Sequence, residues 1–372
     1  MLEITRPTVL LNETIARRNI ARMAAKASEN NLVFRPHFKT HQSIAVGEWF
    51  REAGVRAITV SSMAMAQYFA DAGWEDVLIA FPVNWREIGA INALAERIRL
   101  GLLLESVETA AFLSENLTAE AQVWLKVDTG YHRTGIAWDD TEKLLEVAQA
   151  VVAAPRLRLT GLLTHAGHTY HARGVQQIEA IHRETVTRLQ AARRVLGEAG
   201  FAGLRLSLGD TPSCSVVEDL SGVDEIRPGN FVFYDMMQVQ IGACSAADVA
   251  VAVACPVVAV HPRDRRMVIY GGGVHLSKEF MQRADGLRSY GAVALLAENG
   301  EGWGEPDPDA TVIGLSQEHG IIQASDALLS KVAVGDLVAV LPVHSCMTVN
   351  LLKHYRTLTG DLLPMMGFSY GD

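Results

Sequence analysis

The feature that most constrains the fold is a regular alternation of short apolar runs and longer amphipathic stretches from about residue 12 to residue 230. The first amphipathic stretch, 13–29, places apolar residues at i, i+3, i+4 and i+7, the spacing of one buried helical face. Similar helical stretches follow at 62–72, 85–96, 106–117, 141–153 and 175–200. The apolar runs predict eight strands, at 32–34, 56–60, 77–80, 99–104, 122–127, 158–163, 204–208 and 225–227.

Apolar strands that alternate with helices indicate a parallel sheet whose outer face is covered by helices. Eight such units fit a closed barrel, so we predict an α/β protein built on a (β/α)8 TIM-type barrel over residues 12–240. The alternative is a doubly wound open sheet, which fewer strands would have favoured.

The pattern changes after about residue 240. Short Val-rich runs broken by Gly, Pro and Asp occur at 249–253, 257–260, 267–269, 312–315 and 337–341, and helical periodicity nearly vanishes. We therefore predict a mostly β C-terminal domain. The extended segment 8–11 precedes the first barrel helix and is expected to join the β domain. This second domain therefore comprises residues 1–11 and 241–372.

Charge and composition exclude several classes of partner. The formal net charge is −9, with 33 basic and 42 acidic residues and no long run of like charges, so nucleic acid and anionic membranes are not expected partners. No apolar run approaches the roughly 18 residues that a membrane span needs, and no basic region followed by an apolar stretch opens the chain. The four scattered cysteines suit a reducing compartment. We expect a cytoplasmic protein.

Polar residues gather after the predicted barrel strands, at the C-terminal ends where barrel enzymes place their functional groups. A lysine there can form a Schiff base if desolvation or neighbouring cations keep its amine partly neutral, and His37, His41 and Arg133 are the candidate neighbours of Lys39. The loops 209–213 and 228–230 can direct backbone N–H groups and a hydroxyl at a phosphate. Taken singly, such a lysine is more often solvated and such a loop is more often a simple turn. Their occurrence together on one rim supports a Schiff-base lysine beside a phosphate-binding site.

A possible metal site lies near the C-terminus, where His344 and Cys346 follow an apolar run. Alternate residues of a strand share a face, so imidazole and thiolate could hold one ion. Two protein ligands leave positions for water or substrate, which suits catalysis. The thiolate favours zinc over manganese or magnesium. The alternative is a half-buried histidine beside an inert cysteine.

Together these segments resemble the D-threonine aldolase and D-serine dehydratase family, fold-type III pyridoxal-phosphate enzymes with an alanine-racemase-like barrel. The motifs that carry the resemblance are Arg-Pro-His-Phe-Lys-Thr-His at 35–41, Asp-Thr-Gly-Tyr-His-Arg-Thr-Gly at 128–135, His-Ala-Gly-His at 165–168, Gly-Asp-Thr-Pro-Ser at 209–213, Arg-Pro-Gly-Asn at 227–230, Ser-Gln-Glu-His-Gly at 316–320 and His-Ser-Cys at 344–346. The first and last are specific to the family. Two segments depart from it: Gln42 replaces a frequent lysine, and residues 270–278 replace a more usual Asp-Ala-Gly type of segment.

The resemblance implies roles for individual residues. Lys39 would hold pyridoxal 5'-phosphate, Arg133 would approach its 3-oxygen, and Tyr170 would face its pyridine nitrogen. The other residues expected to contact the cofactor are His165 and, at the phosphate, Thr211, Gly229 and Asn230. A homodimer is expected, with the β domain of one subunit closing the barrel mouth of the other.

The implied function is that of a pyridoxal-phosphate- and metal-dependent lyase acting on a D-β-hydroxy amino acid. Cleavage of Cα–Cβ would make it an aldolase; loss of the Cα proton to Lys39, followed by departure of the hydroxyl, would make it a dehydratase. A metal ion that binds the hydroxyl serves both routes, and the zinc-type ligand Cys346 favours the dehydratase slightly. Two alternatives are an amino-acid racemase and a non-enzymatic pyridoxal-phosphate-binding protein. A racemase would leave His344 and Cys346 without a role, and the non-enzymatic barrel proteins lack the second domain, so both facts count against these alternatives.

Overall fold

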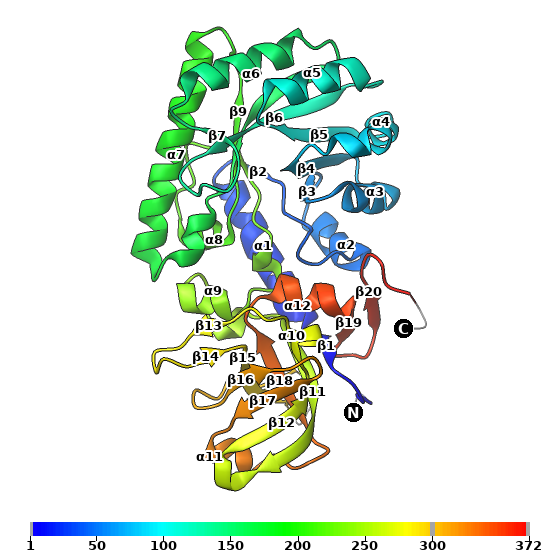
Figure 1. Ribbon diagram of the computed structural model, residues 1–372, viewed down its shortest axis with the longest axis vertical. Coiled ribbons are helices and arrows are strands. Elements are labelled where there is room, and N and C mark those ends of the chain that lie inside the picture. Colours follow the sequence, from blue (N-terminus) through cyan, green and yellow to red (C-terminus); the bar gives the residue numbers. More distant parts are fainter. Residues whose placement is uncertain (1–2, 298–301, 370–372) are drawn as a thin grey trace. The chain divides into compact units, whose positions relative to one another are not determined.

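The computed structural model describes residues 3–297 and 302–369 and divides into two compact units (Figure 1). We call 21–39 together with 50–229 the barrel unit, and 1–20, 40–49 and 230–372 the β unit. The boundaries fall within the helices α1 (Glu13–Glu29) and α2 (Ile44–Glu52). The outermost residues of the predicted second domain, 1–2 and 370–372, lie outside the described residues.

The described part of the barrel unit contains eight parallel strands in the order β2-β10-β9-β8-β6-β5-β4-β3. A parallel bridge between His37, which follows β2, and Thr59 in β3 joins the two ends of this order and closes the ring. The predicted barrel is therefore confirmed, and the open-sheet alternative is wrong. The strands are β2 (Val33–Phe34), β3 (Ile58–Val60), β4 (Asp76–Pro82), β5 (Arg99–Leu104), β6 (Ala121–Asp128), β8 (Leu157–Thr164), β9 (Arg205–Leu208) and β10 (Glu225–Ile226), and β7 (Ile136–Ala137) pairs with β6.

Helices cover the outside of these strands (Figure 1). They are α3 (Met63–Asp71), α4 (Ile88–Ala95) after a 3₁₀ turn, α5 (Val107–Asn116), α6 (Thr141–Ala153), α7 (Val175–Glu198) and the short α8 (Thr211–Val216). Ser62, Ser106 and Asp140 begin three of them as N-caps, each accepting a backbone N–H that the helix itself cannot satisfy. Helix α6 buries one apolar stripe, which includes Leu144, Val147 and Val151. The periodicity of the sequence predicted α3 to α7, whereas the segment of α8 was predicted as a loop.

Two arginines and a glutamate form a buried polar network among the strands. Arg35 donates from Nε to Glu225 at 2.7 Å and from Nη1 to Asp76 at 2.5 Å. The second Glu225 oxygen accepts from Ser207 Oγ, which also accepts from Arg227 Nε at 2.6 Å. A buried charge is tolerated only when it is paired and hydrogen-bonded in this way. The network therefore ties the segments after β2 and β10 to β9.

The β unit contains a sheet in the order β12-β17-β16-β15-β18-β11-β1-β19-β20. These strands are β1 (Thr8–Leu11), β11 (Val251–His261), β12 (Arg266–Tyr270), β15 (Gly291–Leu295), β16 (Thr311–Leu315), β17 (His319–Gln323), β18 (Leu337–Pro342), β19 (His354–Thr357) and β20 (Leu362–Pro364), and β13 (Met281–Gln282) and β14 (Arg288–Ser289) form a separate ribbon. The segment 8–11 lies within the sheet, antiparallel to β11 and parallel to β19. The predicted runs 249–253 and 257–260 fall largely in one strand, β11. The first half of β11 pairs with β1 and β18, and its end pairs with β12.

The sequence analysis did not predict the short helices of the β unit. They are α9 (Met236–Ile241), α10 (Gly273–Leu276), α11 (Asp326–Leu329) and α12 (Ser345–Leu352). One or two turns contain too few residues for a 3.6-residue period to emerge. Among the described residues, no helix is long and apolar enough to cross a membrane.

Candidate active site

Lys39 lies at the end of the segment that follows β2, where its side chain is exposed. Its positive charge acts on the imidazoles of His37 and His165, so these three residues lie together at the C-terminal ends of the barrel strands. Burial, followed by the charges of Lys39 and Arg227, holds the pKa of His37 well below its usual range. His37 is therefore a neutral neighbour of Lys39, so any effect that it has on the lysine amine comes from desolvation and not from charge.

His165 follows β8 and is oriented by its Nδ1 contact with the Gly209 carbonyl oxygen. Its ring centroid lies 5.8 Å from that of Tyr131 and 6.2 Å from that of Tyr170. Burial, then the charge of Lys39, keeps the pKa of His165 well below its usual range. The structure thus brings Lys39, His165 and Tyr170 to one rim, where the imidazole of His165 is neutral.

The loop 128–135 carries Arg133 and is shaped by a single carboxylate. Asp128 accepts the backbone N–H groups of Gly130, Tyr131 and His132 at 2.9 to 3.1 Å, which satisfies a tight turn with one side chain. Arg133 lies over the Tyr131 ring, 5.1 Å from its centroid. Its charge lowers the pKa values of both His37 and His165. Arg133 is therefore a permanent cation at the same rim.

The Gly-Asp-Thr-Pro-Ser segment begins the short helix α8. Asp210 is its N-cap and accepts from Ser213 N at 2.7 Å and from Thr169 Oγ1 at 3.1 Å. The hydroxyl oxygen of Thr211 is buried, and no hydrogen-bond partner is found for it among the described residues, whereas the Ser213 side chain is hydrogen-bonded to Asp210. Buried hydroxyls without partners are rare and indicate a missing water or ligand. Gly229, at the end of this unit, follows Pro228, whose carbonyl accepts His37 N.

This rim fits pyridoxal phosphate. The cofactor is an anion whose phosphate needs several donors, and the rim offers the Thr211 hydroxyl, which has no partner among the described residues, beside several cations, with Lys39 exposed for bond formation. No group of three or more His, Cys, Asp or Glu side chains suited to a metal occurs within the described ranges.

Lys126 is a rim residue that the sequence prediction missed. It belongs to β6, is 5% exposed, and donates from Nζ to Val127 O at 3.1 Å. Burial, then the charges of Arg227 and Arg133, lowers its pKa to about 7. A lysine inside the apolar run 122–127 was the available signal, because such a run ordinarily excludes charge.

His344 and Cys346 belong to the β unit, and the strand geometry predicted for them is wrong. Strand β18 ends at Pro342, His344 is the N-cap residue of α12, and Cys346 lies in the first turn of that helix. The two side chains are nevertheless hydrogen-bonded to each other. A cap residue and one in the first turn can converge because the chain folds back there. Burial alone would lower the pKa of His344, but Cys346 and Glu279 raise it to about 11.

A hydrogen-bonded cluster surrounds Cys346. Its Sγ donates to Thr40 Oγ1 at 3.3 Å and lies 3.6 Å from Asn230 Nδ2. Asn230 also donates to Asp235 at 2.7 Å and to Ser345 Oγ at 3.0 Å. The side chain of Asn230, which the resemblance assigns to the cofactor phosphate, thus lies against the thiol in the β unit.

His41 is also part of the β unit. Its ring is buried, with Nδ1 near the Ser43 carbonyl at 3.1 Å, and Tyr355 donates to its carbonyl oxygen at 2.7 Å. Burial lowers the pKa of His41 to about 3, so this imidazole is neutral.

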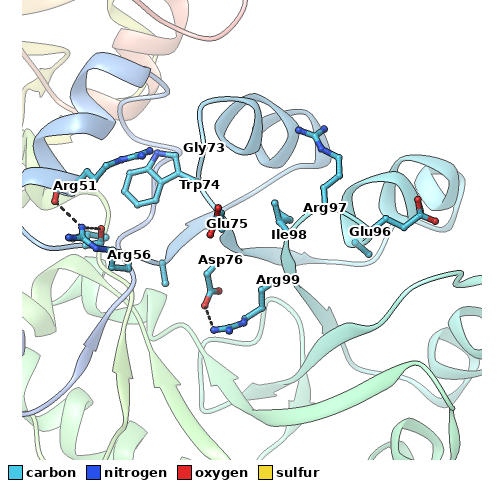
Figure 2. Close-up of a pocket in the computed structure, with 13 residues that line it drawn as sticks. Arg51, Arg56, Gly73, Trp74, Glu75, Asp76, Glu96, Arg97, Ile98 and Arg99 are labelled. Atoms are coloured by element: carbon cyan, nitrogen blue, oxygen red, sulfur yellow. Dashed lines mark hydrogen bonds and ion pairs between the residues drawn. The ribbon is translucent and has the colours of Figure 1, made fainter.

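A cavity of about 930 Å³ lies at the opposite ends of the barrel strands (Figure 2). Its lining includes Asp76 and Arg99, which begin β4 and β5, whereas the residues described above follow the strands. Arg99 pairs with Asp76 at 3.3 Å, and Arg97 pairs with Asp71 at 2.8 Å. We therefore do not assign the reaction to this cavity.

Comparisons with known proteins identify the families that the two parts of the chain resemble. Residues 12–236 match the alanine racemase N-terminal domain family, and residues 250–358 match the serine dehydratase domain family. The chain is 32% identical to D-threo-3-hydroxyaspartate dehydratase of Delftia sp. (strain HT23), over 97% of this chain and 96% of that protein. It is 27% identical to D-serine dehydratase of Dictyostelium discoideum, over 95% and 93% of the two chains.

Solved structures extend this similarity. A cysteine-to-alanine mutant of D-threo-3-hydroxyaspartate dehydratase in its metal-free form is similar with a TM-score of 0.89 and 27% identity, covering 97% of each chain. D-threonine aldolase from Filomicrobium marinum has the same fold, with a TM-score of 0.82 at 21% identity over 98% and 95% of the chains. The protein therefore belongs to the D-threonine aldolase and D-serine dehydratase family of alanine-racemase-like, pyridoxal-phosphate-dependent enzymes.

Proposed function

We propose that this protein is a pyridoxal-phosphate- and metal-dependent dehydratase of a D-β-hydroxy amino acid. The observation that carries the proposal is the barrel rim, where an exposed lysine lies among neutral imidazoles, permanent cations and the buried Thr211 hydroxyl, which has no hydrogen-bond partner among the described residues. The names of the relatives support dehydration, because D-threo-3-hydroxyaspartate dehydratase and D-serine dehydratase both match nearly the whole chain.

The proposed roles at the rim follow from chemistry and position. Lys39 holds the cofactor covalently through its amine, and Arg133 neutralises the 3-oxygen. His165 and Tyr170 contact the ring, since their own rings lie 6.2 Å apart at the same rim. The phosphate binds Thr211, Gly229 and Asn230. When bound, the cofactor withdraws electrons from the bonds at the substrate Cα.

Lys39 also serves as the base that removes the Cα proton, because the residue that holds the cofactor covalently places its amine beside the substrate Cα. The His344 and Cys346 side chains hold a divalent ion, zinc in preference to manganese or magnesium, that assists departure of the β-hydroxyl. The sequence supports joint action of the two sets of residues, because Thr40 directly follows Lys39 and Asn230 directly follows Gly229.

Spectroscopy and peptide mapping test the cofactor. The purified protein should show the visible absorption of a lysine-bound cofactor, and borohydride should attach the cofactor permanently to the peptide that contains Lys39. Lys39→Ala should abolish both results, whereas Lys143→Ala, on the exposed surface of α6, should change neither. Labelling of a peptide without Lys39 would overturn the assignment.

Product analysis tests the reaction and the metal. D-serine, D-threonine and D-threo-3-hydroxyaspartate should be assayed for 2-oxo acid, glycine and the L-enantiomer, with and without chelator. We expect 2-oxo acid and ammonia, loss of activity in chelator, and recovery with zinc. Cys346→Ala should lose activity while keeping the cofactor spectrum. Glycine would indicate an aldolase, and chelator-resistant formation of the L-enantiomer would indicate a racemase.

A homodimer is also part of the proposal, because the fold family pairs subunits around the active site and such interfaces are large. Light scattering of the active protein should give twice the mass of one chain. A fully active monomer would contradict it.

A further inference from the structure

A carboxylate of the β unit contacts the predicted metal ligand His344. Glu279 Oε2 lies 2.6 Å from His344 Nδ1, with the side chains 40% and 31% exposed. We propose that Glu279 is a positioning residue that orients the His344 imidazole for metal binding, and that residues 270–279 of this chain serve to place it. The inference rests on the metal-binding part of the proposed function.

The physical argument concerns the two nitrogens of one imidazole ring. A hydrogen bond from Nδ1–H to a carboxylate fixes the ring orientation and the tautomer, so that Nε2 keeps its lone pair for a metal and becomes a stronger donor. Glu279 is not itself a third ligand in this arrangement. Over residues 3–297 and 302–369, no three His, Cys, Asp or Glu side chains are grouped closely enough to hold an ion.

The glycine run before Glu279 is locked to the hairpin between β16 and β17. Gly271 N donates to Glu318 O at 2.9 Å, and Gly273 N donates to Ser316 O at 2.8 Å. A side chain at position 272 would place its Cβ 2.2 Å from the Gln317 carbonyl oxygen. Only glycine permits this approach, so the glycine run and the Ser-Gln-Glu-His-Gly motif form one backbone support.

This support continues to the start of α12. Helix α10 ends at Leu276, whose carbonyl oxygen accepts from Thr348 Oγ1 of α12 at 3.0 Å. Ser277 is buried with φ of 67°, and its Oγ accepts Glu279 N at 3.3 Å. The chain thus turns sharply after a point attached to α12, and the turn directs Glu279 at His344. Residues 270–278, which depart from the usual family pattern, therefore serve to place Glu279 beside His344.

Metal affinity provides a test that does not depend on turnover. Glu279→Gln should weaken zinc binding by roughly 10- to 100-fold in a competition titration with a chromophoric chelator. The cofactor absorbance, which reports on the barrel unit, should not change. Glu318→Gln is the matched control, because Glu318 is 45% exposed and lies 3.6 Å from another histidine, His275. Its zinc affinity should equal that of the original protein.

The outcomes separate the inference from the proposed function. If the original protein binds no zinc, the metal part of the proposed function fails and the inference with it. If it binds zinc and Glu279→Gln binds zinc equally tightly, only the inference is overturned. Histidine nitrogen NMR of the zinc-loaded original protein gives a second test that needs no variant. It should show His344 protonated at Nδ1 and metal-bound at Nε2, and the reverse pattern would refute the proposal.

Discussion

Replacing Arg35 by leucine should strongly destabilise the barrel unit. The Arg35 side chain is 3% exposed and pairs with Glu225, which is fully buried, at 2.7 Å. It also pairs with Asp76 at 2.5 Å. Leucine fills much of the same space but leaves the Glu225 carboxylate, among the described residues, with the Ser207 hydroxyl as its side-chain donor.

The magnitude follows from the cost of an unpaired buried charge. Removing one partner of a buried ion pair costs roughly 3–5 kcal/mol in the free energy of unfolding. Asp76 loses less, because it is 19% exposed and keeps Arg99 at 3.3 Å. The double variant Arg35→Leu/Glu225→Gln no longer contains the buried Glu225 charge. It should recover part of the loss, because the buried Arg227 then lacks the favourable charge of Glu225.

Urea unfolding followed by tryptophan fluorescence measures these effects, because Trp74 and Trp124 are buried in the barrel unit. Arg97→Leu is the control. It breaks an exposed pair with Asp71 and should cost less than about 1 kcal/mol. The reasoning is refuted if Arg35→Leu costs no more than Arg97→Leu, or if the double variant is no more stable than Arg35→Leu alone.

Two further predictions concern the rim. Lys126 has a pKa of about 7 when folded and an ordinary value of 10.5, so the unfolded chain binds the extra proton between these values. Stability should therefore rise with pH across this window, by at most about 1.4 kcal/mol per pH unit, and Lys126→Met should remove that rise in urea titrations at pH 7 and 9. Thr211→Val should weaken cofactor binding about tenfold in an absorbance titration without lowering the melting temperature of the cofactor-free protein, because its hydroxyl has no partner within the described structure. A fall in melting temperature with unchanged cofactor affinity would show that the hydroxyl is structural.

The barrel could be predicted because its pattern is local. Strands such as 99–104 are nearly continuous apolar runs, and helices such as 141–153 bury a single stripe. A window of about a dozen residues is therefore enough to identify each element as a strand or a helix. Lys39 and the loop 209–213 could be placed on one rim because successive parallel strands end on the same side of a barrel.

The metal ligands show where this reasoning fails. Two-residue spacing suggested a strand face for His344 and Cys346, but the chain turns into α12 between them. Whether a short segment bends depends on its surroundings, here Asp235, which accepts Ser345 N at 2.9 Å from more than a hundred residues away. No local pattern contains that contact.

The sequence by itself determined the alternation of strands and helices, the eight-unit barrel, the lysine at its rim and the family. Those properties depend on the order of apolar and polar residues along the chain. The tertiary structure decided the protonation states of the histidines and the hydrogen-bond partners of the site residues. His37 and His165 are neutral because they are buried among cations, and Glu279 meets His344 because a glycine run packs on a distant hairpin. Desolvation and long-range hydrogen bonds arise only when segments far apart in the chain come together, which is why residue identity alone did not reveal them.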